Sequence, residues 1–425
     1  MEHAVRRFPP FVRLMRAVLQ RVSFVLEVQA EKELGNHAAA GALAFLLSAV
    51  PVLLLSLGLA GWVLEAFPGG TRRLQAWATQ LLGPVHLPDA APTLFGKGFF
   101  TVGTIASVLG LVASSRVFFS SIRRTFKVVW GGKDTVTTWL DVAAGYLLEA
   151  VALVAVIAVL ALSEAARVML FSARHSMEQK MFASLVTVIE AVPLAVLWGF
   201  FVITLRIFPV QKPGWGRVAA YSLVAVGLFE LAGEVLHLVI NTNQYEVLYG
   251  VIANLVLVLL NVSIFFTLYF ATATALFVEQ NFDALLFARH VRRWERNKSD
   301  LVDDALFGDV TRLVARYGRR FEPGQTLFLQ GQTGDTAFFV EQGEVEIVLE
   351  GSHAVVAVLT PGEIFGETAS LLGEPRTATA RARSPLLVLE LPPGVFGFAI
   401  RADRAANRKL LGTLADRLKQ ANARS

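Results

Sequence analysis

The sequence predicts an α-helical polytopic membrane domain with six spans, followed by a β-roll (jelly-roll) domain with flanking helices. Hydrophobic residues make up 54% of the 425 residues and charged residues 17%, and the mean hydropathy is +0.55, above the norm for soluble proteins. The apolar residues gather in long runs that end before residue 280. Residues 326–391 instead form short alternating stretches broken by glycine and proline, a pattern typical of strands.

Charge and composition divide the chain into four segments. We expect a cytosolic or interfacial amphipathic helix in residues 1–41, the six-span domain in 42–280, a charged juxtamembrane linker helix in 281–300 and the roll in 301–425. Residues 1–299 carry 25 Lys and Arg against 18 Asp and Glu, whereas residues 300–425 carry 14 against 16. The basic excess therefore lies beside the apolar runs, which argues against nucleic acid as a partner. Cysteine is absent, which excludes disulfides and Cys-ligated zinc.

The first segment contains an amphipathic pattern in residues 8–33. Arg13, Arg16 and Gln20 share one face of the predicted helix. The other face is apolar and contains Phe11, Met15, Val18, Val22 and Val25. This pattern predicts a helix in the membrane interface. A cleavable signal peptide is the alternative, but the arginines recur through the segment and leave no continuous apolar core.

Six apolar runs each approach the roughly 20 residues that a helix needs to cross the hydrocarbon core. They cover residues 42–64, 99–118, 140–163, 184–205, 218–240 and 251–277. Six spans place both termini on the same side of the membrane. The segments on that side hold 18 Lys and Arg and the opposite loops hold six, so the positive-inside rule predicts that both termini are cytoplasmic.

Five ionisable side chains fall well inside the predicted spans, namely Glu149, Glu190, Glu230, Glu234 and His237. A charge at mid-helix costs on the order of 2.5 kcal/mol or more, so these residues are candidates for a membrane pathway. The alternative is that the carboxyl groups are protonated and hydrogen-bonded between helices. Glu234 and His237 have the spacing of a Glu-x-x-His metal motif, but the sequence has no second such motif, so no metal site is expected.

The stretch FGETASLLGEPRTATA, residues 365–380, has the residue types that hold a cyclic phosphodiester fused to a ribose. Gly366 lets the backbone approach a ligand, and the amides that follow, those of Thr368 and Ala369 included, can bind an anion. Arg376 offers a guanidinium fork for two phosphate oxygens. Glu367 can accept a hydrogen bond from a ribose hydroxyl. The stretch therefore suits both halves of a cyclic nucleotide.

This stretch closely resembles the phosphate-binding cassette of cyclic-nucleotide-binding domains, with Glu367 and Arg376 nine residues apart and Pro375 before the arginine. The upstream stretch FEPGQTLFLQGQTGDTAFFVEQGEVEIVLEG extends the resemblance, which covers residues 301–425. It implies a roll that binds cAMP or cGMP through Gly366, Glu367, Thr368, Ala369, Arg376 and Thr377. In similar domains a threonine after the arginine can bond the guanine amino group, yet many bacterial domains with this pair bind cAMP. The alternative is a roll that keeps its shape and binds nothing.

The apolar part resembles the YihY/BrkB family of inner-membrane proteins over residues 20–285. The resemblance rests on HAAAGALAFLLSAVPVLLLSLGLAG near the start, RRTFKVVWGG after the second run, RIFPVQKPGWGRVAAYSL between the fourth and fifth, and YEVLYGVIANLVLVLL at the sixth. It implies a multi-pass protein of the bacterial inner membrane. The activity of the family is unsettled: transport of solutes or lipids is the usual suggestion, and a ribonuclease label is widely regarded as mistaken.

The linker helix is rich in basic residues. Arg289, Arg292, Arg293, Arg296 and Lys298 are expected at anionic headgroups. They would act as a topology anchor, as a lever between roll and membrane, or as both. Residues 301–316 are expected to form one leading helix of the roll.

These observations predict a cyclic-nucleotide-regulated inner-membrane transporter or permeation pathway, in which the cytosolic domain controls the membrane domain. The alternatives are a membrane-anchored signalling scaffold without transport and, from the old label alone, a membrane hydrolase or nuclease. The sequence has no Walker loop, nucleophile elbow or paired catalytic histidines, so no enzyme, catalytic residue or cofactor is expected. The expected partners are a cyclic nucleotide and the lipid bilayer, and homo-oligomerisation is left open.

Overall fold

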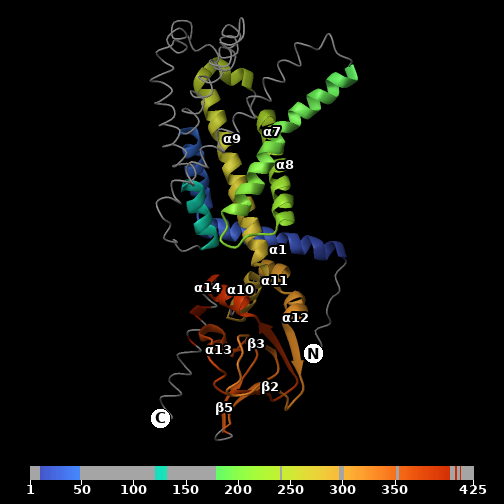
Figure 1. Cartoon of the computed structure of the whole chain (residues 1–425), viewed down its shortest axis with the longest axis vertical. Helices are drawn as coiled ribbons and strands as arrows, with labels where there is room; N and C mark the ends of the chain where they lie inside the picture. Colours follow the sequence, from blue (N-terminus) through green and yellow to red (C-terminus); the bar gives the residue numbers. More distant parts are fainter. Residues whose placement is uncertain are drawn as a thin grey trace. The chain divides into compact units, whose positions relative to one another are not determined.

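The structure is a computed structural model that describes residues 10–47, 120–131, 179–239, 242–295, 301–350 and 354–402, with residues 407, 408 and 412. The chain divides into two compact units. One unit combines Met1–Leu26 with Val278–Ser425, and the other is Glu27–Phe277. The first unit therefore combines segments from the early and late parts of the sequence, which are blue and orange to red in Figure 1.

Three long apolar helices occupy much of the described part of Glu27–Phe277. They are α7 (Gln179–Ile207), α8 (Trp215–Val239) and α9 (Thr242–Gln280). Stretches of 27, 22 and 25 residues within them are long and apolar enough to span a membrane. These stretches confirm the last three predicted runs. The predicted runs 42–64, 99–118 and 140–163 lie wholly or largely outside the described residues.

Aromatic side chains form the centre of this unit. Phe201 of α7 meets Tyr269 of α9 edge to face, with ring centroids 5.0 Å apart, and both side chains are fully buried. Phe266 of α9 packs on the short apolar helix Leu34–Leu47, where a Cβ on Gly41 would lie only 2.8 Å from Phe266 Cδ1. The small residues of the HAAAGALAF stretch thus allow close approach between two helices.

A lysine closes the end of a neighbouring helix in the same unit. Helix α1 (Pro10–Glu31) ends in a turn, from which Lys32 Nζ donates to the carbonyl oxygens of Val128 at 2.9 Å and Val129 at 2.7 Å. These carbonyls belong to the last turn of helix 120–130, where the helix itself supplies no donor and a cation is favourable. Burial lowers the pKa of Lys32, against the opposing effect of the Glu31 charge.

Two antiparallel four-stranded sheets follow in the other unit, in the orders β1-β8-β3-β6 and β2-β7-β4-β5. The strands are β1 (Gly318–Phe321), β2 (Thr326–Phe328), β3 (Ala337–Gln342), β4 (Val345–Leu349), β5 (Ala354–Leu359), β6 (Ile364–Phe365), β7 (Thr379–Ala382) and β8 (Leu386–Leu391). One buried cluster draws side chains from both sheets, including Phe328, Phe338 and Phe365. The short strands predicted over residues 326–391 are confirmed, and they pair in antiparallel fashion.

Among the described residues that follow α9, three helices precede the strands in the sequence, one lies between β6 and β7, and one follows β8. They are α10 (Phe282–Glu295), α11 (Leu301–Phe307), α12 (Thr311–Tyr317), α13 (Glu367–Leu372) and α14 (Pro393–Ala402). The single helix predicted over residues 301–316 is wrong, because α11 and α12 are separate. Gly308 donates its N–H to the Asp304 carbonyl at 2.9 Å in a closing turn, and a Cβ at Gly308 would collide with that oxygen. Glycine therefore marks the end of α11.

Candidate functional site

A glycine-led turn between β6 and α13 forms one side of the candidate site. Gly366 has a φ of +68°, in the left-handed region that glycine tolerates. A Cβ there would lie 2.5 Å from Arg376 Nη1 and 3.2 Å from Phe338 Cδ2. A Cβ at Gly334 would likewise lie 3.0 Å from Arg376 Nη2. The guanidinium of Arg376 therefore has room only because positions 334 and 366 are both glycine.

Arg376 is fixed through its backbone and through its guanidinium. Its N–H donates to the Gln332 carbonyl at 2.9 Å, and its own carbonyl accepts from the Gly331 N–H at 2.8 Å. Nη1 donates to the Gly366 carbonyl at 2.9 Å, while Nη2 donates to the carbonyl and hydroxyl oxygens of Thr336 at 2.8 and 3.1 Å. A guanidinium has five N–H groups, and these hydrogen bonds use three of them. Among the described residues, the other two N–H groups of Arg376 are left to bind another acceptor.

Aromatic rings lie beside this guanidinium. Arg376 Cζ is 4.4 Å from the ring centroid of Phe328 and 5.4 Å from that of Phe338, within the range of cation–π contacts. Burial lowers the pKa of Arg376, and the charges of Asp335, Glu390 and Glu367 oppose that shift. Arginine nevertheless stays protonated near neutral pH. The site thus presents a buried cation with N–H groups to spare, which suits an anion.

The other predicted residues lie on and around α13. Glu367 begins the helix and is 1% exposed, and Ala369 is also buried. Thr368 is half-buried, and Thr377 is exposed. The structure brings Gly366 and Arg376 into direct contact. Within the described residues, the buried Ser370 hydroxyl on the same helix has no hydrogen-bond partner.

Sequence reasoning missed Thr336, Phe328 and Phe338. Thr336 supplies two of the three oxygens that accept hydrogen bonds from the guanidinium, one of them from its backbone. A carbonyl oxygen has no side-chain signature, and phenylalanines within predicted strands look like any strand core. The one available signal was the turn glycine Gly334, two residues before Thr336.

Comparison with known proteins places both parts of the chain. Residues 25–293, more than half of the sequence, match the family described as "Virulence factor BrkB". The chain belongs to the BrkB family. Residues 318–403, which contain both sheets and the Arg376 site, match the cyclic nucleotide-binding domain. This BrkB-family chain is therefore a membrane protein that carries a cyclic nucleotide-binding domain, as its sequence predicted.

Several characterised and uncharacterised proteins are similar to parts of the BrkB-family chain. It is 37% identical over 127 residues to a cAMP-dependent protein kinase regulatory subunit of Yarrowia lipolytica, which covers 30% of this chain and 28% of that protein. It is 39% identical over 100 residues to an uncharacterized protein of Mycobacterium tuberculosis, covering 24% and 19%. The chain thus spans less than a third of the length of either relative. Among solved structures, the catabolite activator protein of Thermus thermophilus is 28% identical over 27% of this chain and 56% of that chain, with a TM-score of 0.24.

The structure assigns four of the five membrane candidates of the BrkB-family domain to two helices. Glu190 lies on α7, and Glu230, Glu234 and His237 lie on α8. The side chains of Glu230 and Glu234, one turn apart, are exposed. Glu149 lies outside the described residues. A pathway through these residues stays a prediction.

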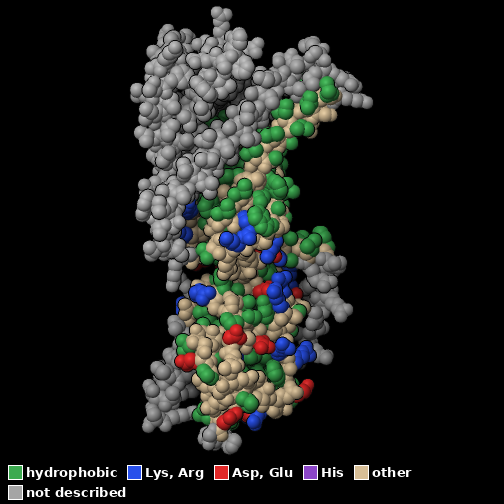
Figure 2. All heavy atoms as spheres, in the orientation of Figure 1, with side chains coloured by type: hydrophobic (Ala, Val, Ile, Leu, Met, Phe, Trp, Pro, Cys, Tyr) green, Lys and Arg blue, Asp and Glu red, His purple; other side chains and the backbone are tan. Residues whose placement is uncertain are grey.

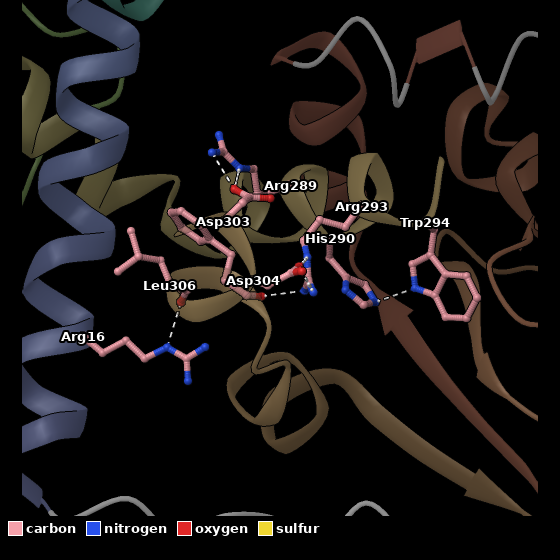
Figure 3. A network of polar contacts seen from close by, with 9 residues as sticks. Arg16, Arg289, His290, Arg293, Trp294, Asp303, Asp304 and Leu306 are labelled. Carbon is pink, nitrogen blue, oxygen red and sulfur yellow. Dashed lines mark hydrogen bonds and ion pairs between the residues drawn. The ribbon is translucent and has the colours of Figure 1, made fainter. Parts of the chain in front are cut away.

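The linker arginines of the BrkB-family chain contact the nucleotide-binding domain. Arg289 donates to Asp303 at 2.7 Å, and Arg293 donates to Asp304 at 2.7 Å and to the Phe307 carbonyl at 3.0 Å (Figure 3). The guanidinium groups of Arg289 and Arg293 are thus each turned towards an acidic residue of α11. The expected place of the linker's basic residues at anionic headgroups stays a prediction. Arg296 and Lys298 lie outside the described residues.

The same helix also packs on the sheets of the domain. Glu341 Oε2 lies 2.8 Å from His290 Nε2, and Trp294 Nε1 lies 3.2 Å from that nitrogen (Figure 3 shows the His290–Trp294 contact). Gly362, with a φ of +95°, sits under the indole, where a Cβ would lie 2.9 Å from Trp294 Cε3. Helix α10 is therefore bound to α11 on one side and to the β3 region on the other.

Proposed function

We propose that this chain is a cyclic-nucleotide-regulated transporter or permeation pathway of the bacterial inner membrane. The observation that carries the nucleotide part is the buried Arg376 with two available N–H groups beside Gly366. In the proposal, Arg376 and the amides of Gly366, Thr368 and Ala369 hold the cyclic phosphate. Glu367 accepts from a ribose hydroxyl and Thr377 contacts the base. No catalytic step and no cofactor are part of the proposal.

The proposed topology has six spans with both termini in the cytoplasm. Three of the spans coincide with α7, α8 and α9. The excess of basic residues in the segments assigned to the cytoplasm supports the orientation. This arrangement puts the nucleotide-binding domain where cyclic nucleotides are made.

Control of the membrane domain is proposed to pass through α10. A single residue, Asn281, separates α9 from α10. The pairs Arg289–Asp303 and Arg293–Asp304, together with the contacts of His290 and Trp294, attach α10 to the nucleotide-binding domain. A shift of α11 or β3 on ligand binding would therefore act directly on the end of the last span.

Calorimetric titration of the full chain in lipid nanodiscs with cAMP and with cGMP tests the nucleotide part. We expect saturable binding of one of the two or both, weakened over a hundredfold in Arg376→Ala. Absence of binding of either nucleotide to a folded protein would reject the sensor. Proteoliposomes loaded with candidate solutes then test the membrane part. Nucleotide-dependent flux supports a pathway, whereas binding without flux favours the scaffold.

A further inference from the structure

One face of α1 is bound to the nucleotide-binding unit. Arg16 Nε donates to the Leu306 carbonyl at 2.8 Å, and its Nη1 pairs with Asp309 Oδ2 at 3.1 Å (Figure 3 shows the first contact). Gln20 Nε2 donates to the same Leu306 carbonyl at 2.7 Å, and its side chain is buried. Arg16 and Gln20 of the predicted polar face thus contact the last turn of α11 and, through Asp309, the residues that follow it.

Aromatic and ionic contacts extend this face of α1. Phe24 is buried between two rings, with centroids 5.9 Å from Phe282 and 5.1 Å from Phe307. Arg21 Nε pairs with Glu279 at 2.6 Å, and its guanidinium lies 4.4 Å from the Phe282 ring. Helix α1 therefore contacts α10 itself and the helices before and after it in the sequence, α9 and α11.

The opposite face of α1 is apolar and exposed. Its members are Phe11, Leu14, Met15, Val18, Leu19, Val22 and Leu26, each between 46% and 70% exposed. Their spacing of three and four residues puts them in one helical stripe without a charged residue. Figure 2 shows hydrophobic side chains at the outer end of α1. The stripe differs in part from the sequence prediction, because Val25 is half-buried and Leu14, Leu19 and Leu26 join it.

We propose that the exposed stripe of α1 lies in the headgroup region of the lipid bilayer, so that α1 clasps the nucleotide-binding unit to the membrane surface. A two-residue turn, Lys32 and Glu33, separates α1 from the apolar helix Leu34–Leu47, so the bilayer that this chain spans is always within reach of the stripe. A soluble partner would have to compete with the lipid bilayer for the stripe.

Charge also favours lipid as the occupant. Arg16 and Arg21 flank the stripe and keep their own carboxylate partners, Asp309 and Glu279, so the stripe offers no charge for an acidic or basic protein to recognise. Binding to the stripe would therefore depend on apolar contact alone, and interfacial helices bind bilayers through their buried apolar area. The proposal rests on the membrane part of the proposed function and does not require nucleotide binding or transport.

The natural lack of cysteine makes a direct test possible. Single nitroxides are placed at Leu14→Cys, Val18→Cys and Val22→Cys in the full chain, in nanodiscs of phosphatidylethanolamine and phosphatidylglycerol. The matched control is Glu322→Cys, at an exposed turn of the nucleotide-binding unit. Because an interfacial helix sits about 5–10 Å into the headgroup and acyl boundary, collisions with a water-soluble nickel complex should fall on the order of tenfold below the control, while oxygen collisions rise.

Two outcomes would overturn the proposal. Nickel collisions at all three positions equal to those at the control would place the stripe in water. Spin–spin broadening that disappears on dilution with unlabelled protein would show that a second copy covers the stripe. Calorimetric titration of the same variants with cyclic nucleotide reports separately on the sensor, so failure of the clasp and failure of the proposed function are distinguishable.

Discussion

Arg376 Nη1 donates to the carbonyl oxygen of Gly366 at 2.9 Å, which closes a ring of eleven residues that contains α13. The carbonyl can accept this bond because Gly366 has no side chain in the way. Thr336 holds the other end of the guanidinium from outside the ring. The cation is therefore in place before any ligand arrives, and little side-chain entropy is left to lose on binding.

Replacement of the arginine tests its role as the anion-binding group. Charge-assisted hydrogen bonds contribute roughly 1.5 to 3 kcal/mol each, so Arg376→Ala should weaken nucleotide binding by about 3 kcal/mol, over a hundredfold. Arg376→Lys should recover only part, since an ammonium cannot make the fork. Glu367→Gln should cost less, about 1 to 2 kcal/mol, because an amide oxygen still accepts. Calorimetry measures all three, with circular dichroism as the folding control. Wild-type affinity in folded Arg376→Ala would contradict the site.

Alanine substitution at two glycines, Gly366 and Gly373, distinguishes the effect of backbone strain from the effect on ligand binding. Gly366 and Gly373 have nearly the same φ, +68° and +71°, so alanine at either should destabilise by roughly 1–2 kcal/mol. A Cβ at Gly373 meets open space, whereas one at Gly366 meets Arg376. We expect Gly366→Ala to lose on the order of tenfold or more in affinity, the worth of one charge-assisted hydrogen bond, and Gly373→Ala to bind normally. Equal affinities in the two variants would show that the position of the guanidinium does not matter.

Thr377 provides a test of base preference. Its side chain is exposed next to Arg376, and so it is free to reach a ligand. We expect Thr377→Ala to weaken cGMP more than cAMP, by the worth of one neutral hydrogen bond, about 1 kcal/mol or fivefold. Titration of both nucleotides into the wild type and the variant measures the difference. Equal losses for the two would remove Thr377 from base recognition.

Acid should loosen the contact between α1 and Asp309. Burial alone would raise the pKa of Asp309, but hydrogen bonds from Thr311 and the charge of Arg16 outweigh it and lower the pKa below its ordinary value of 3.8. The stabilisation is therefore fully present above about pH 4 and is lost as the pH falls through the lowered pKa. Because the side chain is 40% exposed, solvent screening limits the effect to at most about 1 kcal/mol.

Amide hydrogen exchange of α1, measured by mass spectrometry, checks this pH dependence. At pH 6, Asp309→Asn should exchange up to about fivefold faster than the wild type. The two proteins should converge as the pH is lowered through the pKa, since the wild-type carboxyl then becomes neutral as well. A gap that persists in acid would mean that the charge of Asp309 is not the cause.

The membrane carboxylates should matter for activity if a pathway exists. An amide can keep a structural hydrogen bond but cannot titrate. Single replacement of Glu149, Glu190, Glu230 and Glu234 by Gln should therefore leave expression and thermal stability near the parent and abolish flux in at least one variant. Proteoliposome flux is the measurement. Normal transport by every Gln variant would remove these residues from the pathway.

Local sequence patterns were sufficient for the elements that depend on local physics. The three described spans could be predicted from the length of their apolar runs. The cassette could be recognised because Glu367 and Arg376 are nine residues apart. The amphipathic pattern of α1 was also visible. Contacts that depend on chain reversal were not visible. Arg289 and Arg293 were expected at anionic headgroups, and nothing in the sequence indicated that α11 turns Asp303 and Asp304 towards them.

Hydrogen bonds to backbone carbonyl oxygens could not be predicted from the sequence either. Arg16 and Gln20 both donate to one carbonyl, that of Leu306, which lies 290 and 286 residues away, and a backbone carbonyl is the same in every residue. Thr336 escaped notice for the same reason. The break between α11 and α12 was ambiguous because an isolated glycine such as Gly308 is tolerated inside many helices.

The unit built from Met1–Leu26 and Val278–Ser425 has a consequence for how the protein is made. A ribosome that adds about 5 to 20 residues per second needs on the order of ten seconds or more to cover the roughly 250 residues between these segments. During that interval Phe24 and Gln20 of the nascent chain have no Phe307 ring and no Leu306 carbonyl to contact. Translation must reach α11 before these contacts can form, so a prematurely terminated chain keeps α1 without them.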